Sequence, residues 1–551
     1  MDYKERLADW MGWADEKTKQ ELSAVTDEKE MEDRFYKDLE FGTAGLRGIM
    51  GAGSNRMNAY TVARATKGLA DYLHALYGEE ISRGAVIAYD SRLHSREFAE
   101  EAAHVLCAAG IPVRLFCELE PIPVLSFAVK HFQALAGIVI TASHNPKEYN
   151  GYKVYGPNGA QLVPEDADRL TGYVNAVTDL AHIHRTGREE LLTWIGEETV
   201  EAYLAAAFVQ SIYKGNPPPL SIVYTPLHGS GNRPVRALLA RAGFKNVEVV
   251  KAQEAPDGNF PTVRSPNPED HAALALGIAE AERTGADIVI GTDPDSDRIG
   301  AGVRDGDHFV LLSGNQMGAL LVNFLVTMKK ESLTGASTII KTIVTGELGA
   351  DIARAHGVRV EETLTGFKYI GEKISQYEKD PAHDFLMGYE ESYGYLCGTH
   401  AQDKDAVVSA MLIAEMAAWY KAQGMTLADG LRALYETYGY CLDRLSSYTL
   451  QGKEGLEKIQ RIMIRLREED PRRVIPEIET VLDYKKGLQG LPKENVLKFL
   501  LSDGSWMAVR PSGTEPKIKI YYSLKGKNEK EAEARFTAYR NAWEKHLELP
   551  R

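Results

Sequence analysis

The chain has 551 residues, with 64 basic and 78 acidic side chains and therefore a formal net charge of −14. A composition that is 44% hydrophobic and 26% charged is that of a folded globular protein and excludes a largely disordered chain. The acidic balance disfavours broad binding to nucleic acid or to an anionic membrane, although local basic loops can still bind an anionic substrate. At roughly 150 residues per domain, the length predicts three or four domains.

The N-terminus and the cysteines indicate the compartment. The first ten residues, MDYKERLADW, carry charges where a signal peptide is apolar, and the chain has no apolar run of about 18 residues. The four cysteines form no CxxC pair, so neither a zinc ribbon nor a disulfide framework is indicated. We therefore expect a cytoplasmic protein with no membrane partner.

The first 40 residues are strongly charged and helical in composition, so we predict an N-terminal helical extension. The glycine-rich stretch 41–53 (FGTAGLRGIMGAG) ends this pattern. One unit then recurs three times, with a β-rich run, a polar or glycine loop, a helix, a glycine and a second strand. The copies occupy residues 84–116, 220–250 and 337–363.

Each copy has a glycine directly after its helix, at Gly110, Gly243 and Gly357, where a left-handed residue is needed. A strand, a crossover helix and a strand within about 30 residues form the βαβ unit of a mostly parallel sheet. The three copies predict three similar α/β domains. One large α/β sheet is the alternative, which periodicity does not exclude.

From residue 436 onward the pattern changes. Charged helices at 454–469 and 528–547 flank short strands, which predicts a smaller α+β domain at the C-terminus. The predicted class is α/β, with three similar mixed domains followed by this one. The predicted boundaries are 1–40 for the extension, 41–208 for domain I, 209–310 for domain II, 311–435 for domain III and 436–551 for domain IV.

A polar loop, TASHNP, follows the apolar strand predicted at 136–140. Ser143 stands at the carboxyl end of that strand, where α/β proteins bind ligands, and His144 beside it could act as a base. The hydrolase elbow G-x-S-x-G is excluded, because Thr141 and Asn145 occupy the glycine positions. An ordinary Ser/Thr turn is the alternative.

Three aspartates, Asp293, Asp295 and Asp297, alternate directly after an apolar strand predicted at 287–290. Carboxylates this close repel one another unless a cation lies among them, and such oxygen ligands suit Mg²⁺. An EF-hand is excluded, because Arg304 stands at the twelfth position, where that loop needs a glutamate. A solvated acidic loop is the alternative, but the position after a strand favours a metal site.

Two further loops combine groups that suit a sugar and a phosphate. Residues 388–394 (GYEESYG) carry Glu390 and Ser392 two positions apart, which suits contact with sugar hydroxyls, although a surface turn explains the pattern equally well. Residues 510–517 (RPSGTEPK) gather an arginine, two hydroxyls and backbone N–H groups around a glycine, which is typical of an anion-binding nest. An ordinary polar turn between two strands is the alternative there.

Together, these loops point to phosphoryl transfer on a small phosphorylated polyol. No P-loop and no kinase motif set is present, so a nucleotide donor is not expected. In their order along the chain, TASHNP, DPDSDR, GYEES and RPSGTEP resemble the phosphoserine, magnesium, sugar and phosphate loops of the α-D-phosphohexomutase superfamily. The FGTAGLRG segment and the N-terminal extension are similar to the branch of bacterial α-phosphoglucomutases and phosphopentomutase-like enzymes.

The resemblance implies four domains in a heart shape around a central cleft, and it implies roles for individual residues. Ser143 would carry the phosphoryl group, and Asp293, Asp295 and Asp297 would hold Mg²⁺ together with a phosphoserine oxygen. Arg298 would lie near the phosphoserine. The catalytic cleft residues that it implies are His144, Lys153 and Arg47. The substrate-binding residues that it implies are Thr365, Gly366, Lys368, Glu390, Ser392, Arg510, Ser512, Gly513 and Thr514.

The sugar loop departs from part of the family. In many phosphomannomutase-type members the loop has the sequence GGExSGH. This chain has Tyr389, Tyr393 and Gly394 in place of the second glycine, the third glycine and the histidine. Any contact made by that histidine is therefore absent from this chain. The difference favours glucose or a pentose over mannose as the sugar.

The resemblance implies an isomerase of the phosphoglucomutase type, which interconverts glucose 1-phosphate and glucose 6-phosphate through a phosphoserine and a glucose 1,6-bisphosphate intermediate. Its cofactor would be Mg²⁺, and catalytic glucose 1,6-bisphosphate would be its activator. A phosphopentomutase, a glucose 1,6-bisphosphate synthase, a phosphomannomutase and a metal-dependent sugar phosphatase are the alternatives. A binding protein is disfavoured, because binding alone needs neither Ser143 nor the aspartates. The expected partner is a small phosphorylated sugar, and the expected state is a monomer or a homodimer.

Overall fold

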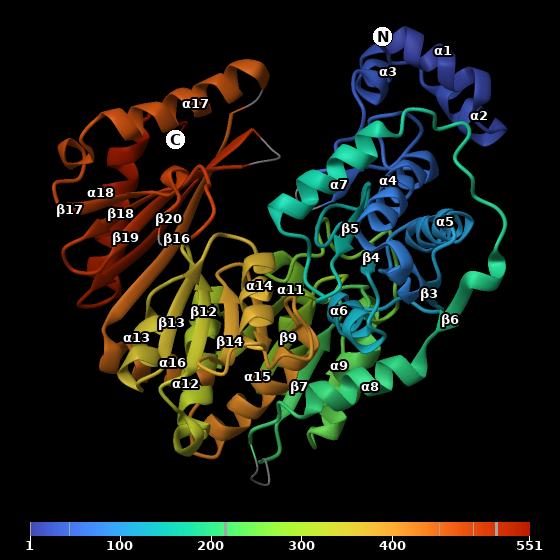
Figure 1. The fold of residues 1–551 in the computed structure, drawn as a ribbon. Coiled ribbons are helices and arrows are strands. Elements are labelled where there is room, and N and C mark those ends of the chain that lie inside the picture. Colours follow the sequence, from blue (N-terminus) through green and yellow to red (C-terminus); the bar gives the residue numbers. More distant parts are fainter. Residues whose placement is uncertain are drawn as a thin grey trace. The chain divides into compact units, whose positions relative to one another are not determined.

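The computed structural model describes residues 2–42, 45–213, 218–450, 452–488, 490–512 and 516–550. The chain folds into two compact units, whose elements are labelled in Figure 1. The first unit comprises Met1–Gly314 and Phe367–Thr426, and the second comprises Asn315–Gly366 and Leu427–Arg551. The third predicted domain is therefore divided between the two units.

The N-terminal extension is helical, as predicted, and forms three short helices. An aspartate caps each helix, since the carboxylates of Asp2, Asp15 and Asp27 accept backbone N–H groups of the first turn. The helices bury Trp10 edge-on against Phe35, with ring centroids 5.6 Å apart. They are α1 (Tyr3–Trp13), α2 (Glu16–Ala24) and α3 (Glu28–Phe35).

The first sheet of this unit has six strands in the order β1-β5-β4-β2-β3-β6. The βαβ unit predicted at 84–116 is present as β2, α5 and β3, and Gly110 after its helix has a φ of 84°. β4 also pairs in parallel with β2, so both strands end at the same edge of the sheet. The strands are β1 (Leu46–Ile49), β2 (Ala85–Tyr89), β3 (Val113–Phe116), β4 (Ala136–Ile140), β5 (Tyr149–Tyr155) and β6 (Leu192–Ile195). The helices are α4 (Ala59–Tyr77), α5 (Ser95–Ala108), α6 (Ile122–His131) and α7 (Pro164–Ala176).

The second sheet has five strands in the order β11-β10-β9-β7-β8. The βαβ unit predicted at 220–250 is present as β7, α9 and β8, with Gly243 at a φ of 91°. β9 pairs in parallel with β7, and β10 returns antiparallel to β9. The strands are β7 (Ser221–Thr225), β8 (Asn246–Val249), β9 (Ile288–Thr292), β10 (Ile299–Asp305) and β11 (His308–Leu311). The helices are α8 (Glu197–Phe208), α9 (Asn232–Arg241), α10 (Lys251–Glu254) and α11 (His271–Thr284).

A third part of the first unit follows from residue 367. Its two strands form an antiparallel hairpin, β14 with β15, and its long helix α15 is apolar nearly all round and buried. α15 packs against β15 and also against α9, which ties this part to the second sheet. The elements are α14 (Phe367–Tyr377), β14 (Asp384–Glu390), β15 (Gly394–Cys397) and α15 (Ala406–Lys421).

The second unit contains the third βαβ unit, formed by β12, α13 and β13, with Gly357 at a φ of 74°. It also contains the predicted C-terminal α+β domain, whose sheet is antiparallel in the order β16-β20-β19-β18-β17. The strands are β12 (Ser337–Thr342), β13 (Arg359–Thr363), β16 (Tyr440–Thr449), β17 (Ile478–Asp483), β18 (Leu497–Leu501), β19 (Trp506–Pro511) and β20 (Lys517–Gly526). The helices are α12 (Gly314–Met328), which begins at the last residue of the first unit, α13 (Leu348–Ala355), α16 (Leu427–Tyr438), α17 (Gly452–Glu468) and α18 (Glu529–His546).

The four-domain prediction is thus confirmed, with mixed α/β elements in each part, and the alternative of one large sheet is wrong. The first two βαβ units belong to separate sheets, and the third lies in the other unit. Among the described residues, no helix combines the length and the apolar character needed to span a bilayer.

Candidate active site

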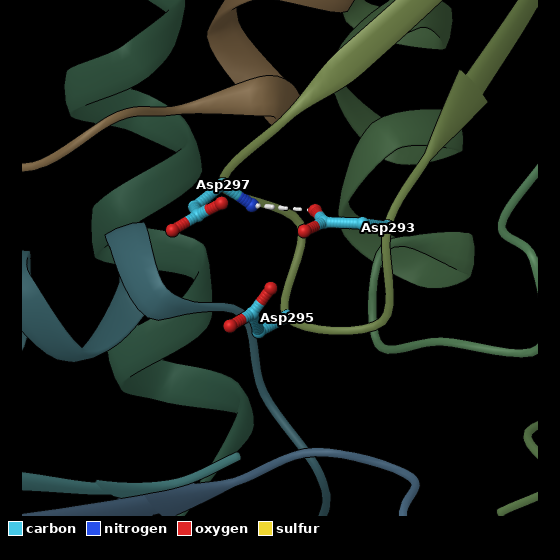
Figure 2. Close-up of side chains that lie close together, drawn as sticks. All are labelled: Asp293, Asp295 and Asp297. Carbon is cyan, nitrogen blue, oxygen red and sulfur yellow. Dashed lines mark hydrogen bonds between the residues drawn. The ribbon is translucent and has the colours of Figure 1, made fainter. Parts of the chain in front are cut away.

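The aspartate loop connects the antiparallel strands β9 and β10. Asp293, Asp295 and Asp297 are buried, although they stand in a connecting loop, and Ser296 between them has a left-handed φ of 51°. One oxygen from each carboxylate lies within 4.8 Å of the others. Figure 2 shows the three side chains turned toward a common point.

The loop is held by its own backbone. Asp293 Oδ1 accepts the backbone N–H of Asp297, at 3.2 Å, and that of Arg298, at 3.0 Å (Figure 2 draws the first). In contrast, Asp295 Oδ1 and Asp297 Oδ1 are buried and have no hydrogen-bond partner among the described residues. Buried carboxylate oxygens left in this way are the ligands that a hard divalent cation such as Mg²⁺ prefers. The residues present therefore fit a metal site.

The charges of the loop are only partly balanced by the protein. Burial raises the pKa of Asp293 well above its ordinary value, and the negative charges of Asp295 and Asp297 raise it further. Burial would also raise the pKa of Asp295, but Lys153 Nζ, 3.1 Å from its Oδ2, lowers it below its ordinary value. Lys404 Nζ lies 3.2 Å from Asp297 Oδ2. The two lysines pair with Asp295 and Asp297 rather than with Asp293. A cation among the three carboxylates would offset the negative charge of Asp293.

The serine loop reaches this cluster from the other sheet of the unit. β4 ends at Ile140, and the loop that follows brings Ser143 Oγ to 3.1 Å from Asp293 Oδ2. The hydroxyl of Thr141 donates to Asp295 Oδ2 at 3.0 Å. β4 pairs in parallel with β2, and β9 pairs in parallel with β7. The serine loop and the aspartate loop therefore both follow the carboxyl end of a parallel strand, which is where α/β folds bind ligands. The predicted serine and aspartate loops thus form one site.

Three further predicted residues lie around Ser143. His144 Nδ1 is 3.2 Å from Ser143 Oγ, and burial, with the positive charges of Arg298 and Arg47, lowers the pKa of His144 well below its ordinary value. Lys153 lies on β5, at the position paired with Val139 of β4. Arg47 on β1 donates to Asn145 Oδ1 at 3.1 Å. Because its pKa is lowered, the imidazole of His144 is uncharged at neutral pH and can accept a proton.

Arg298 connects the aspartate loop to the predicted sugar loop. Its Nη1 lies 2.8 Å from Glu269 Oε1 and donates to the backbone carbonyl of Ser392 at 2.9 Å. Burial would lower the pKa of Arg298, but Glu269 and the aspartates raise it above its ordinary value, and Glu390 adds to this. Arg298 therefore links the sugar loop, in the third part of the first unit, to the aspartate loop of the second sheet.

Lys404 is a residue of this site that sequence reasoning missed. It is buried, and burial would lower its pKa, but Asp297 and Asp403 raise it above its ordinary value. Gly394 explains how it fits, because a Cβ at that position would lie 2.0 Å from Lys404 Cδ. The lack of a side chain at Gly394 thus gives room for Lys404. The only signal in the sequence was the charged run QDKD at 402–405, after a strand.

The remaining predicted residues fall at the unit boundary or in the second unit. Lys368 lies in the first turn of α14, while Thr365 and Gly366 end the second unit's first segment. Arg510 is the penultimate residue of β19, two positions before Ser512, and its Nε donates to Glu494 Oε1 at 2.8 Å. The backbone N–H of Ser512 donates to the carbonyl of Lys517 at 2.8 Å. Gly513 and Thr514 lie outside the described residues.

The order of the four parts corresponds to a known domain series. Residues 38–180, 201–306 and 313–438 match the descriptions "Phosphoglucomutase/phosphomannomutase, alpha/beta/alpha domain I", "domain II" and "domain III". Residues 463–538 match the "C-terminal domain" of the same family. Together these matches cover most of the chain.

Similar proteins have the same architecture. A phosphoglucomutase from Staphylococcus epidermidis (strain ATCC 12228 / FDA PCI 1200) is 38% identical over 533 residues, which cover 94% of this chain and 96% of that protein. The crystal structure of a phosphoglucomutase/phosphomannomutase family protein from Burkholderia thailandensis has a TM-score of 0.69 at 18% identity and covers 93% of this chain and 99% of that one. The Aspergillus fumigatus N-acetylphosphoglucosamine mutase, solved with GlcNAc-6P and magnesium, has a TM-score of 0.51 at 16% identity and covers 98% of each chain.

Proposed function

Because the chain belongs to the phosphoglucomutase/phosphomannomutase family, we propose that it is an isomerase that interconverts glucose 1-phosphate and glucose 6-phosphate. The observation that carries this proposal is the position of Ser143 Oγ, 3.1 Å from Asp293 within a buried cluster of three aspartates. A serine that only binds a sugar has no need of three buried carboxylates beside it. A serine that exchanges a phosphoryl group does, because the group brings a charge of about −2 that a cation must offset.

In the proposed reaction, the resting enzyme carries a phosphoryl group on Ser143. A free hydroxyl of the bound sugar phosphate attacks the phosphorus, its new O–P bond forms, and the Oγ–P bond of Ser143 breaks. The hydroxyl proton goes to a base of the site, and the product of this half-reaction is glucose 1,6-bisphosphate. The bisphosphate then gives its other phosphoryl group to Ser143: a new Oγ–P bond forms, the O–P bond to the sugar breaks, and the base returns its proton to the sugar oxygen, which restores the resting enzyme. Added glucose 1,6-bisphosphate would act as an activator by phosphorylating Ser143.

His144 and Lys153 are the two candidates for that base. His144 is uncharged at neutral pH and lies 3.2 Å from Ser143 Oγ, so it can accept a proton without prior deprotonation. Lys153 Nζ lies 3.1 Å from Asp295 and so sits where it can also offset charge. Arg47 and Arg298 add fixed positive charge beside His144.

For the cofactor we propose Mg²⁺, held by Asp293, Asp295 and Asp297 together with an oxygen of the phosphorylated Ser143. Two buried carboxylate oxygens, Asp295 Oδ1 and Asp297 Oδ1, accept no hydrogen bond from the described residues, which supports this assignment. When bound, the ion would supply positive charge to the phosphoryl group. The fungal relative was solved with magnesium and a sugar phosphate, in line with this assignment.

The substrate contacts are proposed by position in the matching motifs. Glu390 and Ser392 would bind sugar hydroxyls. The carbonyl of Ser392 accepts a hydrogen bond from Arg298, and the charge of Glu390 acts on Arg298 and Lys404. The loop of Thr365, Gly366 and Lys368 would monitor the orientation of the sugar. The non-reacting phosphate would be held by Arg510, Ser512, Gly513 and Thr514.

The proposal is tested with purified protein in two measurements. Glucose 6-phosphate formation from glucose 1-phosphate is followed with glucose 6-phosphate dehydrogenase, in the presence of Mg²⁺ and a trace of glucose 1,6-bisphosphate. Intact-mass spectrometry should show one phosphate on the wild type after incubation with the bisphosphate, and none on Ser143→Ala. Near-normal turnover by Ser143→Ala would contradict the proposal.

The same assays separate the alternatives. Release of inorganic phosphate at the rate of isomerisation would show a phosphatase instead. A kcat/KM for ribose 1-phosphate or mannose 1-phosphate above that for glucose 1-phosphate would show a phosphopentomutase or a phosphomannomutase. Accumulation of glucose 1,6-bisphosphate as the product would show a synthase. The 38% identity to a phosphoglucomutase supports glucose as the main substrate.

A further inference from the structure

Arg92 is an arginine with a fully buried side chain, and none of the roles given above uses it. It stands on the loop after β2, next to the serine loop. Its Nη2 donates to the carbonyls of Ser143, at 2.6 Å, and Asn145, at 2.5 Å. Its Nη1 donates to the carbonyls of Pro146 and Tyr149, both at 3.0 Å. One guanidinium thus binds three carbonyls of the serine loop and that of Tyr149, the first residue of β5, which fixes the path of the loop.

Asp90 and Phe260 hold the guanidinium of Arg92 in place. Asp90 Oδ2 lies 3.4 Å from Arg92 Nε, and Asp90 Oδ1 accepts the backbone N–H of Arg92 at 2.9 Å. The ring of Phe260, from the second sheet's domain, lies over the guanidinium at 5.0 Å. Gly258 brings this segment close, because a Cβ there would lie 2.4 Å from the backbone nitrogen of Leu93.

The segment that covers Arg92 also reaches the serine loop directly. Ser265 Oγ donates to the carbonyl of His144 at 2.6 Å. Residues 258–265 therefore bind both the arginine and the loop that the arginine holds. Residues 258–265 belong to the domain of the second sheet, which also supplies the three aspartates. That domain therefore holds the serine loop in place.

Ser143 needs such support because of its backbone. Its φ is 54°, and a residue with a Cβ pays a steric cost in this left-handed region. The conformation persists only when the surrounding structure fixes it. The hydrogen bond from Arg92 to the carbonyl of Ser143 itself supplies one such contact.

We propose that Arg92 is a positioning residue that holds Ser143 in its left-handed conformation and so keeps Ser143 Oγ at the aspartate cluster. The inference rests on the proposed function, which it deepens. A misplacement of about 1 Å at a reacting group can lower the rate about 100-fold. Substrate affinity should change little, because the Arg92 side chain is fully buried and its contacts are with Asp90, Phe260 and the carbonyls of the loop. Loss of Arg92 should therefore act on kcat and leave KM nearly unchanged.

The test compares Arg92→Lys with a matched control, Arg56→Lys. Lysine keeps the charge but cannot reach four carbonyls with a planar fork. We expect Arg92→Lys to lower kcat at least tenfold, to slow phosphorylation of Ser143 by glucose 1,6-bisphosphate, and to change KM for glucose 1-phosphate less than twofold. Arg56 is also buried, but among the described residues its guanidinium donates to Asp33 and Asn55, so its variant should lower the melting temperature without lowering kcat.

A second variant covers the case in which Arg92→Lys does not fold. Phe260→Leu removes the ring over the guanidinium and leaves the four hydrogen bonds, and it should lower kcat several-fold with KM unchanged. A folded Arg92→Lys with wild-type kcat would overturn the inference, and so would an unchanged kcat in Phe260→Leu when Arg92→Lys fails to fold. A wild type without isomerase activity would instead refute the proposed function, and with it this inference, before any variant is compared.

Discussion

Asp293→Asn is the substitution that most directly tests whether the three buried aspartates form a cation site. Asp293 Oδ1 accepts two backbone N–H groups, those of Asp297 and Arg298, and an asparagine carbonyl can accept both. Asp293 Oδ2 accepts the hydroxyl of Ser143, and the asparagine amide can donate to that oxygen instead. The substitution therefore removes one charge and preserves the shape and the hydrogen bonds of the loop.

The expected gain in the metal-free protein follows from the spacing of the charges. The ligand oxygens lie within 4.8 Å of one another, and two unit charges at that separation repel by about 3 kcal/mol at an effective dielectric constant of about 20. Lys153 and Lys404 pair with Asp295 and Asp297, so the repulsion on Asp293 is the least compensated. Arg298 offsets part of it. We expect metal-free Asp293→Asn to be more stable than the wild type by about 1–3 kcal/mol.

Magnesium should reverse this order. A ligand that binds only the folded state stabilises it by RT ln(1 + [L]/Kd), which is about 2.7 kcal/mol at a concentration of 100 Kd. The wild type should gain this stability, and Asp293→Asn should lose most of the gain, because one of the three carboxylate ligands is gone. The variant should thus be the more stable protein in EDTA and the less stable one in saturating Mg²⁺.

The assay is thermal unfolding at pH 8, first in EDTA and then across a Mg²⁺ titration. Asp443→Asn is the matched control, since Asp443 is a buried carboxyl of the second unit whose pKa burial raises to about 6. Its variant should also gain stability in EDTA, but its response to Mg²⁺ should equal that of the wild type. The reasoning is refuted by an Asp293→Asn protein that is destabilised in EDTA, or by one that keeps the full Mg²⁺ response.

Three further predictions concern a buried lysine, the phosphate loop and a buried glutamate. Lys404→Met removes the buried lysine paired with Asp297 and Asp403, while Arg298 Nε stays 3.8 Å from Asp297, and it should cost about 3–5 kcal/mol of unfolding free energy, so an unchanged denaturant midpoint would contradict the pairing. Arg510→Gln should raise KM for glucose 1-phosphate about 10- to 100-fold, the effect of losing a charge-assisted contact with phosphate, and a wild-type KM would remove Arg510 from the substrate site. Burial raises the pKa of Glu120 to about 8, so its contribution to stability is present below its ordinary value near 4.5 and is lost as the pH rises through about 8. At about 1.4 kcal/mol per unit of pKa shift, the unfolding free energy of Glu120→Gln should exceed that of the wild type by at most about 5 kcal/mol at pH 9. If the unfolding free energies of the two proteins change in parallel from pH 6 to pH 9, the pKa of Glu120 is not raised by burial.

Several parts of the fold were predictable because the signals are local. The three βαβ units follow from strand, helix and glycine within about 30 residues, and the glycines Gly110, Gly243 and Gly357 all have the left-handed φ that the helix ends require. The serine and aspartate loops were predictable for a similar reason. Each follows an apolar strand of a parallel pair, and the residue types in each loop already limit its chemistry.

Other features depend on residues that are distant in the chain. Lys404 offsets Asp297 from another part of the first unit, and Gly394 provides the room for its stem. Arg92 binds the serine loop and Phe260 covers its guanidinium. The sequence around each of these two residues gives no sign of these contacts. Such contacts have no periodicity or spacing in the sequence from which to predict them.

By itself, the sequence determined the local elements, the order of the domains and the chemical groups that each loop presents, because helices, strands and turns depend on neighbouring residues. Only the tertiary structure decided that the serine and aspartate loops meet at 3.1 Å, that the three aspartates are buried, and which lysines compensate them. The physical reason is that the energy of a charge depends on its burial and on its distance from other charges in space. Both are set by packing between segments that the order of residues does not bring together.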